Sequence, residues 1–413
     1  TSDPTGGWYQ YAIDTGPSST LPDYPLLGYN DKWVVITTND FFNLFFNSVR
    51  ISVINKADLL AGTLSTINTF FDASGIFTLS PAETLDAGVG IEYMLVNYNG
   101  NSGGSGYVQL CGISGAVNSP VYTAGSVIGV NQTWSTTTLT GKQKGTNQTI
   151  DAGTVKMRSV IIRNGSLYAS QNISLPATAP TRASAQWWQI NPATAAVIQF
   201  GRLDVASGKY SATFPSLSVS ADNDVLIGFS VFGSPLYASA GYAYRNSTDA
   251  LNTLRNPVIF KSGESTYYKT YGGSRNRWGD YSATCIDPSD GSFWTLQEYA
   301  ASPADTWGTW WANVAVIPFT TVNKKAAIVE MLQLSPNPAK NIVAVKWQSV
   351  KEGSADLQIS DAGGNILIRK NIKVVTGGNQ ENLQIANLKT GTYNVTLIMK
   401  NGDMARSQLI VTK

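Results

Sequence analysis

Short runs of β-branched and aromatic residues, separated by clusters of Gly, Asn, Asp and Pro, fill almost the whole chain of 413 residues. Strands joined by tight turns have this pattern, because the first residue types fit a pleated surface and the second adopt turn conformations. The longest helical signal, at 56–61, amounts to about one turn. The sequence therefore predicts an all-β protein.

An imperfect repeat underlies this pattern. Each copy is an aromatic or apolar strand, a turn of Asp, Asn and Gly, and a second strand, and copies begin at Tyr24, Ser159, Phe214 and Tyr281. The last two copies start 67 residues apart, a length typical of a four-stranded propeller blade with long loops. We predict a β-propeller of about five blades. The rival architecture is a stacked array of β-sandwiches.

The start of the chain favours a missing N-terminal part of the propeller. Residues 8–13 have the pattern of a lone outer strand, whose inner partners lie upstream of Thr1 unless the strand closes the ring against the last blade. The sequence shows no initiating Met and no signal-peptide pattern, although an exported protein needs an export signal. We expect Thr1 to be a processed or truncated start.

The charge changes sign along the chain. Residues 324–413 hold 12 Lys or Arg and 6 Asp or Glu, whereas the remainder holds 17 and 21. We interpret this change as a domain boundary and predict a propeller ectodomain at 1–319, a linker at 320–331 and a C-terminal domain at 332–413. The overall formal charge of +2 gives no reason to expect nucleic-acid binding, and the sequence has no apolar run long enough for a transmembrane helix.

The C-terminal domain is short and rich in hairpin signals. Its pattern predicts six or seven short strands in about 80 residues, and Asn-Gly at 401–402 lies between two alternating strands, which is the strongest local signal of a hairpin. The length and the strand count favour an immunoglobulin-like β-sandwich.

Four motifs in this domain carry a family resemblance, namely Leu334-Ser335-Pro336-Asn337-Pro338, the stretches 361–367 and 388–393, and the closing strand that ends the chain. In this order and at the extreme C-terminus, they resemble the type A C-terminal sorting domains of the bacterial type IX secretion system. The residues that match the sorting signal are Pro336, Asn337, Pro338, Asp361, Gly364, Leu388, Gly391, Tyr393 and Lys413. The chain departs from the family at Gln408, where Lys is common.

This resemblance implies a source in the Bacteroidota and export in a folded state through the outer-membrane translocon, followed by capture by a shuttle barrel. It further implies a protein that is secreted or held at the cell surface. Cleavage near 320–332 would lead to attachment on lipopolysaccharide or to release. The basic residues of the domain either meet an acidic outer-membrane partner or form only a solvated face.

The ectodomain resembles a second family. Residues 2–8, Asp23-Tyr24-Pro25, and 277–282 followed by 287–294 resemble secreted bacterial β-propeller proteins of sialidase-like architecture. Members of that family carry further blade strands before the first of these motifs, in agreement with the expected truncation. The resemblance implies a propeller and brings no established activity.

Histidine is absent from the chain, which excludes Ser-His-Asp and Cys-His catalysis and removes the commonest zinc ligand. Glycoside hydrolysis remains, because it needs only carboxyl groups or, in propellers of the sialidase type, a Tyr nucleophile with Glu and an arginine cluster. The ectodomain holds four Glu residues, at 83, 92, 264 and 298. We predict a protein that is not an enzyme and assign no catalytic residue.

A polar cluster precedes the last copy of the repeat. Arg275, Arg277, Asp280 and Tyr281 would form an anion or sugar site at the mouth of the propeller channel. The alternative is structural: Arg277 and Asp280 pair between blades, and Trp278 packs beneath them.

Trp187 and Trp188 form a second candidate ligand site, because flat aromatic rings stack on sugar rings, and Trp307, Trp310 and Trp311 form a similar group. Adjacent residues on a strand point to opposite faces, so we expect one tryptophan of each neighbouring pair to lie in the core.

Two further features have open interpretations. Asp222-Asn223-Asp224 offers hard oxygen ligands for Ca²⁺, but it lacks the spacing of an EF-hand, so we favour a plain Asx-rich turn and assign no metal site. Cys111 and Cys285 either form a disulfide or are two buried thiols.

The leading functional hypothesis is a type IX cargo whose propeller acts as an adhesin or another binding module for a glycan or protein ligand. One alternative is a His-independent glycoside hydrolase or lyase. The other is a structural component of a surface layer that binds no small ligand.

Overall fold

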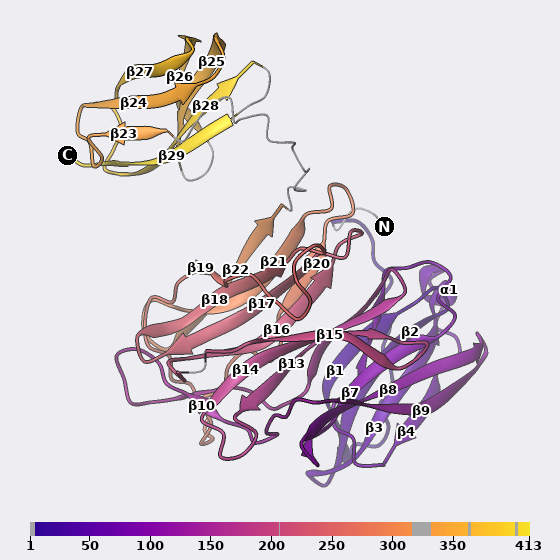
Figure 1. Cartoon of the computed structure of the whole chain (residues 1–413). Coiled ribbons are helices and arrows are strands. Elements are labelled where there is room, and N and C mark those ends of the chain that lie inside the picture. The colour runs from indigo at the N-terminus through magenta and orange to yellow at the C-terminus, as the bar shows by residue number, and fades with distance from the viewer. Residues whose placement is uncertain (1–4, 206, 316–331, 362–364, 401–403) are drawn as a thin grey trace. The chain divides into compact units, whose positions relative to one another are not determined.

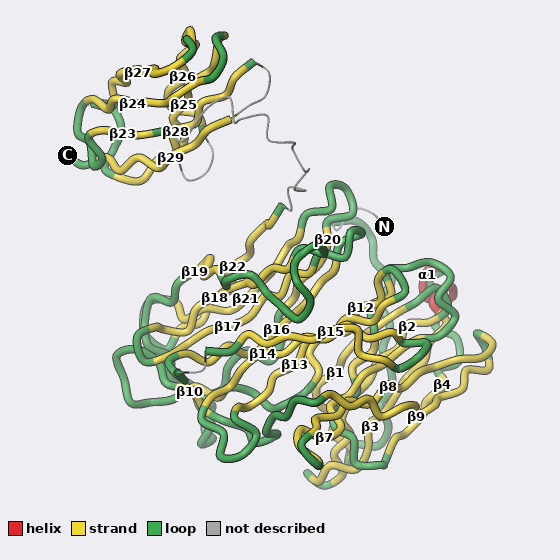
Figure 2. The backbone as a smooth tube through the Cα atoms, in the orientation of Figure 1, coloured by secondary structure: helices red, strands yellow, loops and turns green. Residues whose placement is uncertain are grey.

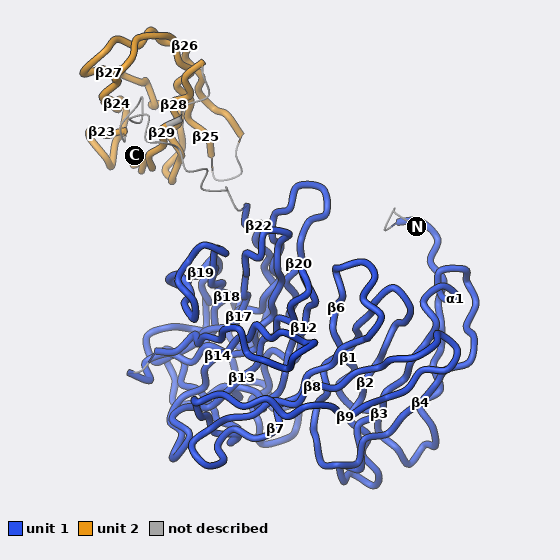
Figure 3. The backbone as a smooth tube through the Cα atoms, turned by 45° about the vertical axis from the view of Figure 1, so that its right-hand side comes forward, with its two compact units in different colours: residues 1–316 blue, residues 317–413 orange. Residues whose placement is uncertain are grey.

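The computed structural model describes residues 5–205, 207–315, 332–361, 365–400 and 404–413. The chain divides into two compact units, 1–316 and 317–413 (Figure 3). The regular structure of the described residues is almost entirely strand (Figure 2), so the all-β prediction is confirmed. The one described helix, α1 (Lys56–Leu60), lies where the sequence predicts a single helical turn, and the side chain of Asn55 caps it by accepting from the Ala57 N–H.

Nineteen strands of unit 1 form five consecutive antiparallel meanders, here called meanders 1 to 5 (Figure 1). Meander 1 is β1 (Thr20–Tyr29), β2 (Trp33–Phe42), β3 (Phe45–Asn55) and β4 (Asn68–Asp72), and meander 2 is β5 (Ser80–Pro81), β7 (Glu92–Ser102), β8 (Ser105–Ala116) and β9 (Ser119–Val130). Meander 3 is β12 (Met157–Arg163), β13 (Ser166–Leu175), β14 (Arg182–Asn191) and β15 (Ala196–Leu203). Meander 4 is β16 (Tyr210–Val219), β17 (Val225–Gly233), β18 (Leu236–Arg245) and β19 (Val258–Lys261). Meander 5 is β20 (Ala283–Ile286), β21 (Phe293–Ala301) and β22 (Thr306–Val314).

The first strands of the meanders lie next to one another. β12 contacts β16, β16 contacts β20, and β5 contacts both β1 and β12. The short strand β6 (Glu83–Thr84) pairs in parallel with both β1 and β12, which joins meanders 1 and 3 into one hydrogen-bonded sheet. A further hairpin, β10 (Thr140–Gly141) and β11 (Ile150–Asp151), precedes meander 3. Unit 1 is therefore propeller-like, with each first strand innermost, and the predicted number of about five repeats agrees with its meanders.

The faces of β14 explain the buried tryptophans. Trp187 packs against meander 4 beside Leu217 and Ile227, whereas Trp188 packs against residues of meander 2 such as Leu95. Both side chains are 0% exposed. Alternation along the strand does place them on opposite faces, but both faces are covered by neighbouring sheets. The prediction that Trp187 and Trp188 bind a ligand is therefore wrong.

The segment 8–13 is not a strand. No ladder forms there, and Trp8 and Tyr9 are exposed. The Tyr11 hydroxyl donates to the Leu59 carbonyl at 2.6 Å, which ties the segment to α1. The prediction of an outer strand at 8–13 is therefore wrong, since the segment is held to α1 by a side-chain hydrogen bond and not by a strand ladder.

Neither cysteine forms a disulfide. Cys111 is buried among the apolar side chains shared by meanders 1 and 2, whereas Cys285 is exposed. The interpretation of two buried thiols therefore holds for Cys111 only.

Unit 2 is a sandwich of two antiparallel sheets. One sheet has the order β23 (Gln333–Ser335), β24 (Ile342–Ser349) and β27 (Gly377–Gln384). The other has the order β26 (Ile366–Val374), β25 (Gly353–Ser360), β28 (Gly391–Met399) and β29 (Met404–Val411). Alternate residues of both sheets, including Val343, Leu357 and Val395, enclose one apolar core. The predicted linker, 320–331, lies outside the described residues.

A pair of tryptophan variants tests the packing of unit 1. We expect Trp188→Ala to lower the free energy of unfolding by about 3–5 kcal/mol, because it empties a large site between meanders 2 and 3. Trp311→Ala is the matched control, since this side chain is 61% exposed, and it should change the same quantity by no more than about 0.5 kcal/mol. Urea unfolding followed by circular dichroism measures both. Equal effects would contradict the packing described for β14.

Candidate functional site: an axial cavity lined by arginines

β-Bulges aim three side chains at the axis of unit 1. The register shifts between Asp23 and Leu26 in β1, between Met157 and Ser159 in β12, and between Thr213 and Ser216 in β16. The residues inside these shifts are Tyr24, Arg158 and Phe214. A bulge bends its strand and redirects a side chain. The repeat seen in the sequence is therefore also a repeat of inward-pointing residues.

The redirected side chains meet each other and the segment before β20. Arg158 Nη1 donates to the Tyr24 hydroxyl at 2.8 Å and to the Asp280 carbonyl at 3.0 Å, and the Tyr24 hydroxyl donates to the same carbonyl at 2.9 Å. The rings of Tyr24 and Tyr281 stack with centroids 5.0 Å apart. The Arg158 guanidinium lies 4.8 Å from the centre of the Phe214 ring. These contacts, here called the axial plug, join meanders 1, 3, 4 and 5.

A cavity of about 290 Å³ lies against the axial plug. Its charged lining residues are Asp23, Asp151, Lys156, Arg158, Arg275, Arg277 and Asp280, and Tyr24 and Tyr281 add two aromatic rings. All four residues that the sequence grouped before the last repeat therefore lie in one cavity.

Two of the arginines are paired with carboxylates. Arg275 Nε donates to Asp151 Oδ2 at 2.5 Å, a contact between the loop before β20 and strand β11. Arg277 Nη2 lies 2.6 Å from Asp280 Oδ2. The predicted pair of Arg277 and Asp280 is thus present, but both residues belong to one loop, so the pair does not join two blades.

Asn276 holds the arginine loop in place. Its side chain is buried and donates to the carbonyls of Thr149 and Tyr267 at 3.0 and 2.9 Å. The backbone carbonyl of Asn276 accepts from the Asp151 N–H. Trp278 is buried beneath the loop, as the sequence suggested, and its Nε1 donates to Ser230 Oγ at 3.1 Å. The backbone of the loop is therefore fixed, and the flanking guanidinium groups extend into the cavity.

Sequence reasoning missed Lys156. Its ammonium nitrogen lies 3.0 Å from the centre of the Tyr24 ring, and among the described residues it makes no hydrogen bond or ion pair. Burial, with the neighbouring Arg158 guanidinium, lowers the pKa of Lys156 to about 7. The signal that could have found it is its position directly before a copy of the repeat.

Glu298 supports the loop from behind. Its Oε2 accepts from the Gly279 N–H at 2.8 Å. Gly279 has φ +55°, and a Cβ there would lie 2.7 Å from the Phe214 ring, so the close approach requires glycine. Burial raises the pKa of Glu298 from its ordinary 4.5 to about 7.

The raised pKa of Glu298 predicts a pH dependence of stability. Because the folded state keeps this proton to higher pH than the unfolded state, the stabilisation is full below about pH 4.5 and is lost as pH rises towards 7. Glu298→Gln keeps an acceptor for Gly279 and should remove up to about 3 kcal/mol of this dependence. Urea unfolding at several pH values between these limits measures it. A Glu264→Gln control, at an exposed residue, should leave the dependence intact, and an unchanged slope in Glu298→Gln would contradict the assignment.

The remaining tryptophans of the sequence analysis lie on β22. Trp307, Trp310 and Trp311 are 48%, 47% and 61% exposed, so no one of them is fully in the core. They do not line the axial cavity.

The acidic turn at 222–224 is closed by protein donors. The Asp224 carboxylate accepts from the Ser247 N–H at 2.7 Å, and Asn223 Oδ1 accepts from Asn164 Nδ2 at 2.9 Å. Among the described residues, no group of three or more His, Cys, Asp or Glu side chains is arranged to hold a metal ion.

In unit 2, the motifs that carry the resemblance to sorting domains have structural roles. Asn337 Oδ1 accepts from the Ile410 N–H and its Nδ2 donates to the Gln408 carbonyl, both at 2.8 Å, so the opening Pro336-Asn337-Pro338 stretch is fastened to the last strand. The terminal residue acts similarly, since Lys413 Nζ donates to the Ala386 carbonyl.

The second half of the signal builds turns. Asp361 accepts from the Asn365 N–H at 2.9 Å, and the partly buried sequence around Leu388 and Gly391 leads into β28. The Tyr393 hydroxyl donates to the Lys389 carbonyl four residues upstream at 2.8 Å, which is the geometry of a tyrosine corner in β-sandwich domains. Gly364 lies outside the described residues.

Comparison with known families identifies this unit. Residues 333–412 match the family described as secretion system C-terminal sorting domain. Unit 2 is a type IX sorting domain. The sorting domain implies engagement with the type IX secretion machinery and export across the outer membrane, so the protein is secreted or attached at the cell surface.

Structural comparison of the whole chain finds distant likenesses. A subtype N10 neuraminidase-like protein of A/little yellow-shouldered bat/Guatemala aligns with a TM-score of 0.36 at 8% identity, covering 96% of both chains. An α-L-arabinanase of Penicillium chrysogenum gives 0.36 at 10%, over 71% of this chain and 93% of its own, and an arabinoxylan arabinofuranohydrolase of Bacillus subtilis gives 0.33 at 11%, over 95% and 93%. At such TM-scores the likenesses carry no argument about activity.

No curated protein matches the chain. The described residues contain no helix long and apolar enough to cross a membrane.

The bonds of Asn337 predict the effect of its removal. Asn337→Ala loses both links to β29, and we expect the free energy of unfolding of unit 2 to fall by about 1–2 kcal/mol. The control is Asn371→Ala, because the Asn371 side chain donates to the half-buried Asp356 carboxylate on a neighbouring strand of the same sheet, and its loss should cost no more than about 0.5 kcal/mol. Hydrogen exchange of the backbone amides of the sorting domain, measured in the full chain, gives this free energy of unfolding for both variants. Equal values would contradict the anchoring role of Asn337.

Proposed function

We propose that the protein is an exported binding module, in which unit 1 is a five-bladed β-propeller that binds the carboxylate of an acidic glycan in its axial cavity. The sorting domain delivers this cargo to the outer-membrane translocon and a shuttle barrel. The observation that carries the proposal is the convergence of Lys156, Arg275 and Arg277, from two distant segments, on one cavity beside stacked tyrosines.

The charges of the cavity favour an anion. The cavity lining holds four cationic and three carboxylate side chains, a formal excess of one positive charge. Asp151 and Asp280 each pair with one arginine, and the Lys156 ammonium makes no hydrogen bond or ion pair among the described residues. The side chains of Arg275 and Arg277 remain 55% and 49% exposed, so their outer N–H groups can donate to a ligand. Guanidinium groups bind carboxylates with two parallel hydrogen bonds.

The aromatic rings favour a sugar as the carrier of that carboxylate. Tyr281 stacks one face on Tyr24 and is itself 55% exposed. An exposed ring presents an apolar face on which a pyranose can stack, while its hydroxyl remains available for hydrogen bonding. An acidic sugar would therefore satisfy both the cations and the ring.

Glycoside hydrolysis is the second candidate, and Glu298 is the observation that favours it. A carboxyl group with a pKa of about 7 suits a general acid. Against hydrolysis, none of the residues that line the cavity is a Glu, and of its three carboxylates Asp151 and Asp280 are engaged by arginines, which leaves Asp23. Neither a pair of carboxyl groups without arginine partners nor a Tyr with a Glu is thus assembled there, and binding without turnover is the better supported function.

Binding to a glycan array, with hydrolysis products read by mass spectrometry from the same wells, tests the proposal. We expect acidic glycans to bind and their neutral counterparts not to bind. Arg277→Met and Lys156→Met should each weaken binding about tenfold or more, because each removes a charge-assisted contact. Lys209→Met is the matched control, since Lys209 also lies over a tyrosine ring but outside the cavity. Binding that ignores the acidic group would contradict the proposal, and released products would establish hydrolysis instead.

The pKa of Lys156 predicts how this binding varies with pH. Below about pH 7 the amine is protonated and attracts the anion, and above it the amine is neutral. Affinity for the acidic glycan should therefore be higher at pH 6 than at pH 8, and Lys156→Met should remove most of this difference. Titration calorimetry with one acidic oligosaccharide measures it. A wild-type affinity that is flat over this range would exclude Lys156 from the contact.

Deletion of 332–413 tests the sorting assignment separately. The truncated protein should accumulate in the periplasm, because the signal that the type IX machinery reads is gone. Immunoblotting of periplasm, cell surface and medium measures the distribution. Wild-type levels of the truncated protein in the medium would contradict the assignment.

A further inference from the structure

A second cavity, of about 390 Å³, lies where the end of β15 meets meander 4. Its lining is mainly apolar and includes Leu203, Tyr210, Phe229, Val231, Leu254 and Ile259. It shares no lining residue with the axial cavity. Ligand sites for small molecules have this size and this apolar character, with a few polar groups that orient the ligand.

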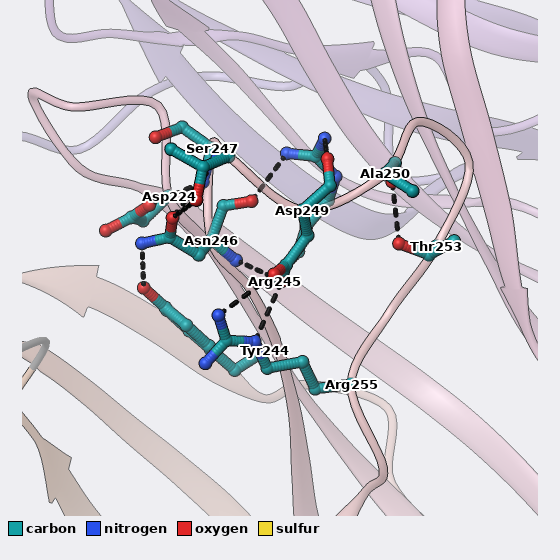
Figure 4. A network of polar contacts seen from close by, with 10 residues as sticks. Asp224, Tyr244, Arg245, Asn246, Ser247, Asp249, Ala250, Thr253 and Arg255 are labelled. Carbon is teal, nitrogen blue, oxygen red and sulfur yellow. Dashed lines mark hydrogen bonds and ion pairs between the residues drawn. The ribbon is translucent and has the colours of Figure 1, made fainter. Parts of the chain in front are cut away.

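One wall of this cavity is the loop between β18 and β19, and a polar network fixes it (Figure 4). The Asp249 carboxylate binds Arg255 at 2.8 and 2.9 Å and accepts from the Asn246 N–H at 2.9 Å. Arg245 donates to the carbonyls of Asn246 and Asp249 at 3.0 and 2.9 Å. The loop therefore keeps its shape without a ligand.

The same loop is tied to meander 3 on its far side. Asn252 Oδ1 accepts from the Phe200 N–H at 3.0 Å, and the Asn252 N–H donates to Gln199 Oε1 at 3.2 Å. Both walls of the cavity are thus joined by hydrogen bonds, so the apolar space between them is preformed. A preformed site loses little conformational entropy when a ligand enters.

Three charged residues line this cavity, namely Asp204, Arg255 and Arg202. Asp204 pairs with Arg182 and Arg255 pairs with Asp249, so the polar group that distinguishes the cavity is Arg202. Its guanidinium donates only to neutral oxygens, at 2.8 Å to Gln186 Oε1, 2.9 Å to the Thr133 carbonyl and 3.4 Å to Gln132 Oε1. Among the residues that the structure describes, it forms no ion pair. The nearby Asp204 carboxylate is engaged by Arg182, with two contacts of 2.7 Å. Burial lowers the pKa of Arg202, which expresses the cost of holding this cation without a carboxylate partner.

We propose that this cavity binds an amphipathic monocarboxylate, with its hydrocarbon part among the apolar residues and its carboxylate on Arg202. An anion at this position would neutralise a half-buried charge that forms no ion pair among the described residues, and the hydrocarbon part would cover the apolar walls. A free sugar is a poor fit, because the apolar lining offers few partners for its hydroxyl groups.

Titration calorimetry on the full chain with decanoate, and with 1-decanol as its uncharged counterpart, tests this inference. We expect decanoate to bind with one molecule per chain and about tenfold more tightly than 1-decanol, because only the carboxylate gains a charge-assisted contact. Arg202→Met should reduce the affinity for decanoate to that for 1-decanol. Arg163→Met is the control, since this arginine also donates to a carbonyl but lies outside the cavity.

Variants that fill the cavity with a larger side chain test whether the probes bind there. Val231→Trp, with Ala212→Phe as a second variant should the first fail to fold, should abolish binding of both probes, whereas Lys156→Met in the axial cavity should leave both unchanged. Equal affinity for decanoate and 1-decanol would overturn the role of Arg202. Unchanged binding in a folded variant with a filled cavity, or no binding of either probe by the wild type, would overturn the site. The fate of the glycan proposal does not depend on any of these results.

Discussion

Two hydrogen bonds from Arg158 Nη1, to the Tyr24 hydroxyl and to the Asp280 carbonyl, connect parts of unit 1 that are remote in the sequence, since Tyr24 and Asp280 lie 256 residues apart. A guanidinium suits this position because it offers several donors in a fixed plane and also packs on the Phe214 ring. The axial cavity exists because these side chains close the axis on one side. The bulges of the first strands lie at the same place and direct Tyr24, Arg158 and Phe214 to this axis.

The two cavities of unit 1 differ in how charge is balanced. In the axial cavity, Arg275 and Arg277 have carboxylate partners, and Lys156 forms no ion pair among the described residues and has a lowered pKa. In the cavity beside β15, Arg202 is held by neutral oxygens within an apolar lining. The first environment suits a polar anion with ring surface, and the second suits an anion attached to hydrocarbon. The same physical cost, a cation partly removed from water, marks both sites.

The sorting domain shows why a short signal can be read from sequence. Asn337 and Tyr393 act through their own side chains on backbone groups, so only particular residue types can make these bonds. The core positions of the sandwich need only apolar residues of suitable size. The motif residues are therefore recognisable one by one, whereas the rest of the domain is recognisable only by its alternation.

The sequence alone determined the all-β class, the propeller-like repeat, the sorting domain and the cluster before the last repeat. Each of these depends on local patterns: alternation, turn residues, and residues a few positions apart such as Arg277 and Asp280. It could not decide that Trp187 and Trp188 are both buried, because this follows from the sheets that cover the two faces of β14. The sequence also could not predict that Lys156 lies over the Tyr24 ring, or that Arg202 lines an apolar cavity. Those outcomes depend on packing between meanders, which brings together residues that lie far apart in the chain and share no local pattern.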